Sequence, residues 1–439
     1  MKYGALVLAV AATVLNACAH SPATVSSDHH DGLSQAPITT VTSMDSQRDI
    51  VLAVANPIEP PATHAGSSML GYIPPNYYGA GQRAVSVLSD LKQHYGLREV
   101  TGWPIKALGV YCIVVETPPS VDRDALLKTL AKDERVQLAQ PLQDYAVYAD
   151  KPQADKSQDA HQYNDPYVDL QRGFVETDAA VAHNVSQGEG VHIAVVDTGA
   201  DLTHPDLLGR IHDTHNMVDD DASAFNLDHH GTEVAGVIAA DADNHKGIVG
   251  IAPKAVLSVY KACWYPVTPH SGARCNSFTL AKALAAIIDT DARIINLSLG
   301  GPADPLLNKL LAQLLDQGRI VIAALPPDGS LDGFPDSAPG VIVVRVSATT
   351  ASPPGVLSAP GNDILTTQPG GGYDFTSGSS MAAAHVSGIA ALLLSLVPRL
   401  DAHTAHDLLL RSSKVSHGML QVNAASAVAD LHSAKGTTP

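Results

Sequence analysis

Residues that mark specialised protein classes are scarce in this chain of 439 residues. It has only 4 cysteines, too few for a disulfide-based scaffold of this length. Lys and Arg total 27 against 44 Asp and Glu, and this acidic balance (net charge −17) argues against nucleic-acid binding, which needs a basic face. No apolar run after the extreme N-terminus reaches the ~18 residues that a membrane-spanning helix needs. Hydrophobic residues still make up 45% of the chain, enough to bury a large core, and the length suggests two domains.

An export signal is predicted at the N-terminus. One Lys precedes an apolar run over residues 5–15, which is too short to span a bilayer stably. The run ends in LNAC, which resembles the signal of bacterial lipoproteins, where the cysteine becomes lipid-modified. We therefore expect residues 1–18 to be a signal peptide and Cys18 to carry a lipid anchor in the bacterial cell envelope. Ala19, in place of Asp, favours the outer membrane, and secretion without an anchor is the alternative.

The other three cysteines fit an oxidising compartment. Cys263 and Cys275 flank a short segment with Pro and Gly, so a disulfide that closes this loop is predicted. Cys112 lies among apolar residues and is predicted to be a buried thiol. The chain has neither a CxxC pair nor an HExxH motif, so no metal site is predicted from cysteine or histidine spacing.

Composition divides the rest of the chain into five segments. Residues 19–66 are rich in Ser, Thr, Pro, Asp and His and are predicted to be a disordered tether. Residues 67–149 show a strand–helix–strand–strand pattern, which favours a small α+β domain of the ferredoxin-like type. Residues 150–163 are polar and are predicted to be a linker. Residues 164–432 form a second, larger domain, and residues 433–439 are predicted to be a disordered tail.

The larger domain alternates short apolar strands with helices of ten or more residues. This alternation predicts an α/β fold, a parallel sheet with helices on both faces. In such sheets the chemistry lies where strands end and helices begin. Strands are predicted at 191–196, 256–260, 294–297, 320–324 and 341–346, and helices at 233–240, 279–290, 306–317 and 380–396.

Three such junctions carry an Asp, a His and a Ser. Asp197 ends an apolar strand in VVDTG, His230 precedes a helix in HHGTEVAG, and Ser380 begins a long apolar helix in SGSSMAAAHVSG. Taken alone, each is more often a turn or a helix cap. Together they are the set that activates a hydroxyl nucleophile, because His removes the proton and a buried Asp fixes the His tautomer. A Ser at a helix N-terminus also has its own N–H aimed at an oxyanion beside it.

These blocks resemble the subtilisin-like serine proteases, or subtilases, whose known order Asp, His, Ser they share. Shorter matches (GIAP, INLSLG and APG) extend the resemblance from about Asn164 to Leu431. The resemblance implies a subtilisin-like fold and a serine endopeptidase that forms an acyl-enzyme and requires no cofactor. It implies that Asp197, His230 and Ser380 are the catalytic triad.

One departure from the family pattern falls on the oxyanion site. The family has an Asn after a run of small residues, and the amide of this Asn donates to the oxyanion. Aligning VIAA with that run puts Pro327 in its place, and Pro has neither an amide side chain nor a backbone N–H. The Ser380 N–H remains as one donor, and Ser330 or a protonated Asp328 is a candidate replacement. The alternative is a weakened or inactive scaffold that acts as a binding or regulatory protein.

The resemblance also concerns substrate and partners. A protein or peptide substrate is expected to lie extended along Ser298, Leu299 and Gly300 and to pair there as an added strand. The smaller domain resembles the propeptide-inhibitor domains that precede subtilases. It is therefore expected to chaperone and inhibit the enzyme until self-cleavage between about Ala149 and Asn164, with a permanently attached structural domain as the alternative.

Two acidic runs in the sequence are candidate metal-binding segments. Many subtilases carry structural calcium, and the acidic runs Asp219–Asp221 and Asp241–Asn244 could supply its oxygen ligands. No catalytic metal is expected. Because the chain has 20 His, a metal-dependent hydrolase is kept as an alternative of another class.

Overall fold

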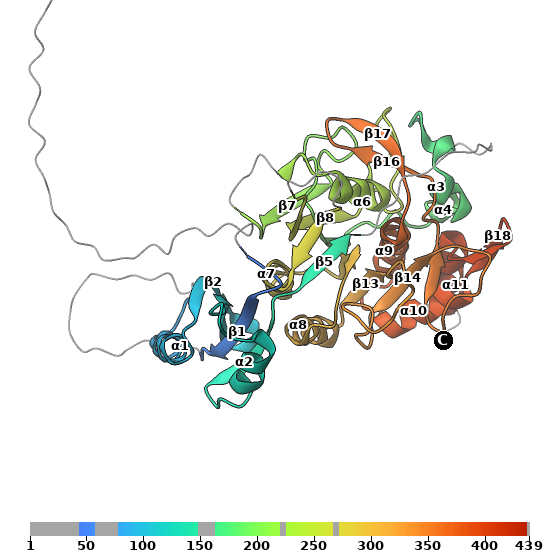
Figure 1. Cartoon of the computed structure of the whole chain (residues 1–439). Helices are drawn as coiled ribbons and strands as arrows, with labels where there is room; N and C mark the ends of the chain where they lie inside the picture. The colour runs from blue at the N-terminus through green and yellow to red at the C-terminus, as the bar shows by residue number, and fades with distance from the viewer. Residues whose placement is uncertain (1–43, 58–77, 148–162, 220–224, 267–271, 437–439) are drawn as a thin grey trace, which may run out of the picture. The chain divides into compact units, whose positions relative to one another are not determined.

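The computed structural model describes residues 44–57, 78–147, 163–219, 225–266 and 272–436 (Figure 1). The predicted signal peptide with Cys18, and all but the last residue of the predicted linker 150–163, lie outside the described residues.

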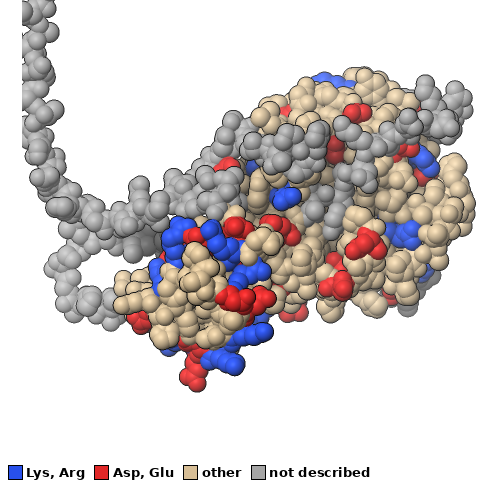
Figure 2. Space-filling view, viewed as in Figure 1, with Lys and Arg blue, Asp and Glu red and all other residues tan. Residues whose placement is uncertain are grey.

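The smaller domain is built around a four-stranded antiparallel sheet with strand order β2-β3-β1-β4. Helices α1 and α2 pack on one face of it, against alternate residues of β1 and β3. The chain order β-α-β-β-α-β with this strand order is the ferredoxin-like topology that was predicted. In the view of Figure 2, Lys and Arg lie beside Asp and Glu over this domain, so its charged surface there is mixed in sign. Its elements are β1 (Asp49–Ala55), α1 (Gln82–Tyr95), β2 (Arg98–Ile105), the 3-10 helix η2 (Lys106–Leu108), β3 (Val110–Glu116), α2 (Arg123–Leu130), β4 (Val136–Pro141) and β5 (Asp144–Val147).

Strand β1 corrects the prediction of a disordered tether over residues 19–66. The segment DIVLAVA of β1 is a central strand of the sheet and is buried almost throughout. Ile50 and Leu52 face the helices, whereas Val51 and Ala53 belong to a hydrophobic cluster shared with the larger domain. Averaging the composition over the whole polar segment hid this short apolar run. The predicted tail 433–439 is also wrong in part, because the last helix continues to Gly436.

The larger domain contains a seven-stranded sheet in the order β15-β14-β13-β11-β6-β8-β7, with every neighbouring pair parallel. Alternate residues of β6 separate the two sides: Ile193 and Val195 pack with helices α6 and α9, and Ala194 and Val196 pack with α7 and α8. The parallel sheet with helices on both faces is therefore confirmed (Figure 1). The strands are β6 (His192–Asp197), β7 (Ile211–Asn216), β8 (Val256–Lys261), β11 (Ile294–Leu297), β13 (Ile320–Ala324), β14 (Ile342–Val346) and β15 (Leu357–Ala359).

Several shorter elements complete the larger domain. Two hairpins stand outside the main sheet, and three strands of two or three residues form another sheet with β5. The helices are η3 (Val168–Leu170), α3 (Arg172–Glu176), α4 (Ala179–Ala182), α6 (His229–Ala239), α7 (Ser277–Ile288), α8 (Pro305–Asp316), α9 (Ser379–Leu396), α10 (Ala402–Arg411) and α11 (Ala424–Gly436), and the other strands are β9 (Cys263–Trp264), β10 (Arg274–Asn276), β12 (Leu299–Gly300), β16 (Ile364–Gln368), β17 (Gly372–Thr376), β18 (Lys414–Ser416) and β19 (Met419–Gln421).

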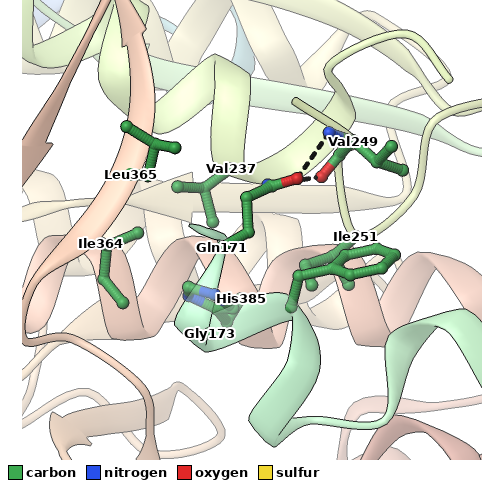
Figure 3. A pocket seen from close by; sticks show the side chains of 9 residues that line it. Gln171, Gly173, Val237, Val249, Ile251, Ile364, Leu365 and His385 are labelled. Carbon is green, nitrogen blue, oxygen red and sulfur yellow. Dashed lines mark hydrogen bonds between the residues drawn. The ribbon is translucent and has the colours of Figure 1, made fainter. Parts of the chain in front are cut away.

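Helix α9 is the central helix of the core. Among the described residues it is the one helix long and apolar enough to cross a membrane, but 89% of it is buried inside the protein. One polar residue of α9, His385, is fully buried and lines a small cavity (Figure 3). Its Nδ1 donates to the carbonyl oxygen of Met381 at 2.8 Å. Gly173 packs directly against the ring, since a Cβ there would lie 2.2 Å from Nε2.

Burial of His385 makes the stability of the fold depend on pH. Burial lowers the pKa of His385 from 6.5 to about 4. Between pH 4 and pH 6.5 His385 is protonated in the unfolded chain and neutral in the native state, so the free energy of unfolding rises with pH. The contribution is fully present above pH 6.5 and is lost as the pH falls toward 4, and it amounts to at most about 3 kcal/mol.

We expect urea unfolding of a Ser380→Ala protein, which lacks the hydroxyl of the expected nucleophile, to show lower stability at pH 4.5 than at pH 7. His385→Gln should reduce this difference between the two pH values by about 1–3 kcal/mol, because the titrating group is gone. The exposed His403 on α10 gives a matched control, His403→Gln, that should leave the difference unchanged. An unaltered pH dependence in His385→Gln would contradict the assignment.

Candidate active site

Asp197 and His230 form a buried hydrogen-bonded pair at the carboxyl edge of the sheet. Asp197 is the last residue of β6, and His230 lies in the first turn of α6. The Nδ1 atom of His230 lies 2.8 Å from Oδ1 and 3.0 Å from Oδ2 of Asp197. The backbone N–H of Thr198 also donates to Asp197 Oδ1, at 2.7 Å. Because a carboxylate can only accept, Nδ1 carries the proton, which leaves Nε2 as the basic nitrogen.

Two glycines allow this pair to form. A Cβ on Gly231, the residue after His230, would lie 1.9 Å from the carbonyl oxygen of Gly199. Gly199 itself has φ +124°, a conformation that other residues rarely adopt. The glycines of VVDTG and HHGTE are therefore required by the close approach of the two segments that carry Asp197 and His230.

Ser380 begins helix α9 beside the same sheet edge. Its side chain is fully buried, and its Oγ donates to the carbonyl oxygen of Ser298 at 3.1 Å. In return, Ser298 Oγ donates to the carbonyl oxygen of Ser380 at 3.2 Å. Ser298 follows β11, which pairs with β6 so that Leu297 lies opposite Val196. The next residues along these two strands, Ser298 and Asp197, therefore lie side by side at the sheet edge.

A buried polar network holds Ser298 in place, and sequence reasoning did not identify it. Asn296 Nδ2 donates to Ser298 Oγ at 2.9 Å, and Ser387 Oγ, two turns along α9 from Ser380, donates to Asn296 Oδ1 at 2.8 Å. These bonds tie α9 to β11 and fix the register of Ser380 along the sheet edge. The polar residues inside the apolar segments INLSLG and AAAHVSG were the available signal.

The loop after β13 lies next to the start of α9, because Ser379 Oγ donates to the carbonyl oxygen of Leu325 at 2.7 Å. Pro327 is exposed in a turn of this loop. The carboxylate of Asp328 accepts the backbone N–H of Ser330 at 3.0 Å and its hydroxyl at 2.8 Å. These bonds lower the pKa of Asp328, so it is ionised at neutral pH and cannot donate. The expectation of a protonated Asp328 is therefore wrong, and the Ser330 hydroxyl donates to Asp328.

A buried ion pair stands beside the candidate site and was also missed by sequence reasoning. Lys261 Nζ donates to the Asp228 carboxylate and, at 2.5 Å, to the carbonyl oxygen of Thr198, the residue after Asp197. Burial raises the pKa of Asp228 to about 6, although Lys261 acts in the opposite direction. The pair fixes the turn that presents Asp197, and it joins this turn to the residues just before His230.

Strand β5 of the smaller domain is inserted beside the site. It lies between β12 and β10 and is antiparallel to both, in the strand order β12-β5-β10-β9. Leu299 pairs with Val147 and Gly300 with Ala146, so these two residues accept an added strand. Cys263 and Cys275 form a disulfide that joins β9 to β10. Cys112, in the smaller domain, is a buried free thiol, and burial raises its pKa to about 12.

The loop Asp241–Asn244 is one of the two acidic runs that could supply calcium ligands. Asp206, which faces this loop, accepts hydrogen bonds from Asn244 Nδ2 at 2.9 Å, from the N–H of Ile248 at 2.9 Å and from Tyr373 Oη at 3.0 Å. The carboxylate oxygens of Asp206 are therefore taken up by N–H and O–H donors, so Asp206 does not fit as a cation ligand beside this loop. Within the described ranges, no three His, Cys, Asp or Glu side chains are grouped to hold a metal ion. Asp220 and Asp221 of the other acidic run lie outside those ranges.

Comparisons with known proteins agree with this geometry. The sequence model of the Subtilase family matches residues 188–432, more than half of the chain. The thermophilic serine proteinase of Bacillus sp. (strain AK1) is 38% identical over 247 residues, covering 53% of this chain and 59% of its own. Thermitase of Thermoactinomyces vulgaris is 34% identical over 244 residues, covering 53% of this chain and 85% of its own.

A solved structure extends the likeness in fold. Fervidolysin from Fervidobacterium pennivorans, described as a keratinolytic enzyme related to subtilisin, aligns with a TM-score of 0.67 at 20% identity. The alignment covers 87% of this chain, and so reaches beyond residues 188–432, but only 61% of fervidolysin. The chain thus spans less than two thirds of fervidolysin and of the Bacillus proteinase. The predicted subtilisin-like fold is confirmed, and the chain belongs to the subtilase family.

Proposed function

We propose that this protein is a serine endopeptidase that uses Asp197, His230 and Ser380 as its catalytic triad. The observation that supports this most strongly is the buried His230–Asp197 hydrogen bond at the edge of the sheet where α9 presents Ser380. Membership of the subtilase family, with its serine protease relatives, points to the same activity.

The proposed reaction follows from the protonation states at this edge. The Ser380 hydroxyl turns from Ser298 O toward His230, and Nε2 takes its proton as Oγ attacks the peptide carbonyl. Asp197 stabilises the resulting imidazolium and keeps its Nδ1–H in place. His230 then gives the proton to the leaving amine, which departs and leaves an acyl-enzyme on Ser380. A water molecule, activated in the same way, hydrolyses this ester and restores the Ser380 hydroxyl.

The smaller domain is proposed to inhibit the enzyme until it is cut off. The ladder that β5 forms with β12 occupies the edge along which an extended substrate would pair. The cleavage is expected between about Ala149 and Asn164, and residues 149–162 of this segment lie outside the described residues.

We expect the purified wild-type protein to have a new N-terminus in this segment, and the Ser380→Ala protein to remain intact. N-terminal sequencing of both proteins checks this. A fluorophosphonate probe should modify Ser380 of the processed wild-type protein and leave the Ser380→Ala protein unlabelled. An unprocessed wild type that the probe does not label, while folded, would support the inactive scaffold instead.

Pro327 is proposed to lower the rate of peptide hydrolysis relative to an enzyme with Asn at this position. A side-chain amide at this position is expected to donate to the oxyanion, and loss of one such donor within this family costs about 10²–10³ in rate. The Ser379–Leu325 bond brings the loop to the start of α9.

Pro327→Asn should therefore raise kcat by about 10-fold or more, with little change in KM, because the new donor acts on the transition state only. Peptide hydrolysis by the wild-type and variant proteins measures this. Pro327→Ala is the matched control, which lacks the amide and should show no such gain. Equal kcat values for all three proteins would mean that the loop does not reach the oxyanion.

Export and lipid anchoring are proposed from residues 1–18 alone, with Cys18 as the modified residue. Cys18→Ser should abolish incorporation of radiolabelled palmitate in a bacterial host and move the protein from the membrane fraction to the soluble fraction. Wild-type protein that incorporates no palmitate would favour the alternative of secretion without an anchor.

A further inference from the structure

One side chain anchors strand β5 in the larger domain. Tyr145, the second of only four residues in β5, is 1% exposed and is among the largest fully buried side chains of the protein. Its ring meets the ring of Phe334 edge to face, with 5.5 Å between centroids. Gly301 forms another wall of the pocket, because a Cβ there would lie 2.3 Å from the Tyr145 ring. The pocket therefore has the shape of an aromatic ring.

The far end of this pocket is polar. The Tyr145 hydroxyl lies 3.1 Å from Oδ2 of Asp304, which is itself fully buried, and 3.3 Å from the carbonyl oxygen of Pro302. Burial raises the pKa of Tyr145 above its ordinary value, and the negative charge of Asp304 raises it further. The phenol therefore stays protonated and donates.

Asp304 is held rigidly in this position by its other bonds. It is the N-cap of α8, and its Oδ1 accepts the N–H groups of Leu306 at 2.9 Å and Leu307 at 3.0 Å. Its Oδ2 accepts the Ser277 hydroxyl at 2.6 Å. The carboxylate is therefore fixed by elements of the larger domain and does not depend on Tyr145 for its position.

The register of β5 relates this pocket to the nucleophile. Val147 pairs with Leu299, and the strands are antiparallel, so β5 runs toward Ser298, whose carbonyl oxygen accepts the Ser380 hydroxyl. A peptide that continued this register would have its next residue opposite Ser298. That residue would present its carbonyl carbon to Ser380, and the residue in the pocket lies three positions before it.

We propose that this pocket is a substrate subsite that selects tyrosine over phenylalanine, with Asp304 as the specificity-determining residue. The inference rests on the proposed function, because it assumes that substrates bind along the ladder that β5 occupies. A phenylalanine in the pocket would leave Asp304 buried with one donor fewer, whereas tyrosine supplies a charge-assisted hydrogen bond. Sites built to bind a substrate hydroxyl reject the analogue that lacks it.

The test measures how fast the full-length protein, as purified, hydrolyses three N-acylated peptide p-nitroanilides. They carry Tyr-Ala-Val-Tyr, the sequence of residues 145–148, or the same sequence with Phe or O-methyltyrosine at the first position. We expect kcat/KM for the Tyr peptide to exceed that for the Phe peptide by about 10- to 100-fold. The O-methyltyrosine peptide, which cannot donate, should be no better than the Phe peptide.

Two variants test whether the preference for Tyr over Phe depends on the Asp304 carboxylate. Asp304→Ser keeps a helix-capping oxygen but is too short to reach the phenol, so the Tyr-to-Phe ratio should fall to about 1. The matched control is Asp316→Ser, at the exposed end of the same helix, which should keep the wild-type ratio. If Asp304→Ser only damaged the structure, hydrolysis of the Tyr and Phe peptides would slow equally and their ratio of kcat/KM would stay at the wild-type value. That result would overturn the role of Asp304.

Two outcomes with the wild-type protein separate the inference from the proposed function. Equal kcat/KM values for the Tyr and Phe peptides would overturn the subsite and leave the protease assignment standing. No hydrolysis of any of the peptides, together with no fluorophosphonate labelling of Ser380, would overturn both.

Discussion

The hydrogen bond between Asp197 and His230 imposes the strictest constraint on this fold. It requires the end of β6 and the first turn of α6 to approach so closely that Gly199 and Gly231 have no room for side chains. The sheet satisfies this constraint because its parallel strands all end at one edge, where the adjacent strand β11 leads into Ser298. The bonds of α9 to Ser298, together with the bond from Ser387 to Asn296, bring Ser380 to the same edge.

The helix that presents Ser380 also forms the centre of the core. Most of α9 is buried, and two of its polar residues show the consequence: Ser387 bonds to the site through Asn296, and His385 is enclosed in the core. Stability and the proposed activity are therefore difficult to alter separately along α9. A substitution that shifts this helix against β11 changes the position of Ser380, and one that weakens the contacts of Ser380 also disturbs the core.

Five of the seven strands in the sheet of the larger domain were predicted, because they are apolar runs separated by helices. Strand β7 was missed because its sequence IHDTHN is largely polar, and β15 because it has only three residues. Asp197, His230 and Ser380 could be predicted as a triad because each stands at a strand–helix junction in a distinctive local motif. Strand β1 was missed because its apolar run is short and lies among polar residues. The Lys261–Asp228 pair and the pocket of Tyr145 could not be predicted, since their partners are far apart in the chain and only the packing of separate elements brings them together.

The strand β1 has a consequence for how the two domains would part. Val51 and Ala53 belong to a hydrophobic cluster that also includes Leu280 and Ala283 of α7, and Tyr145 of β5 lies in the same cluster. Cutting the chain between the domains would remove none of these contacts. After the cut, the smaller domain would no longer be covalently linked to the larger one but would still be bound to it. Its release would therefore depend on dilution and on the rate at which the complex dissociates.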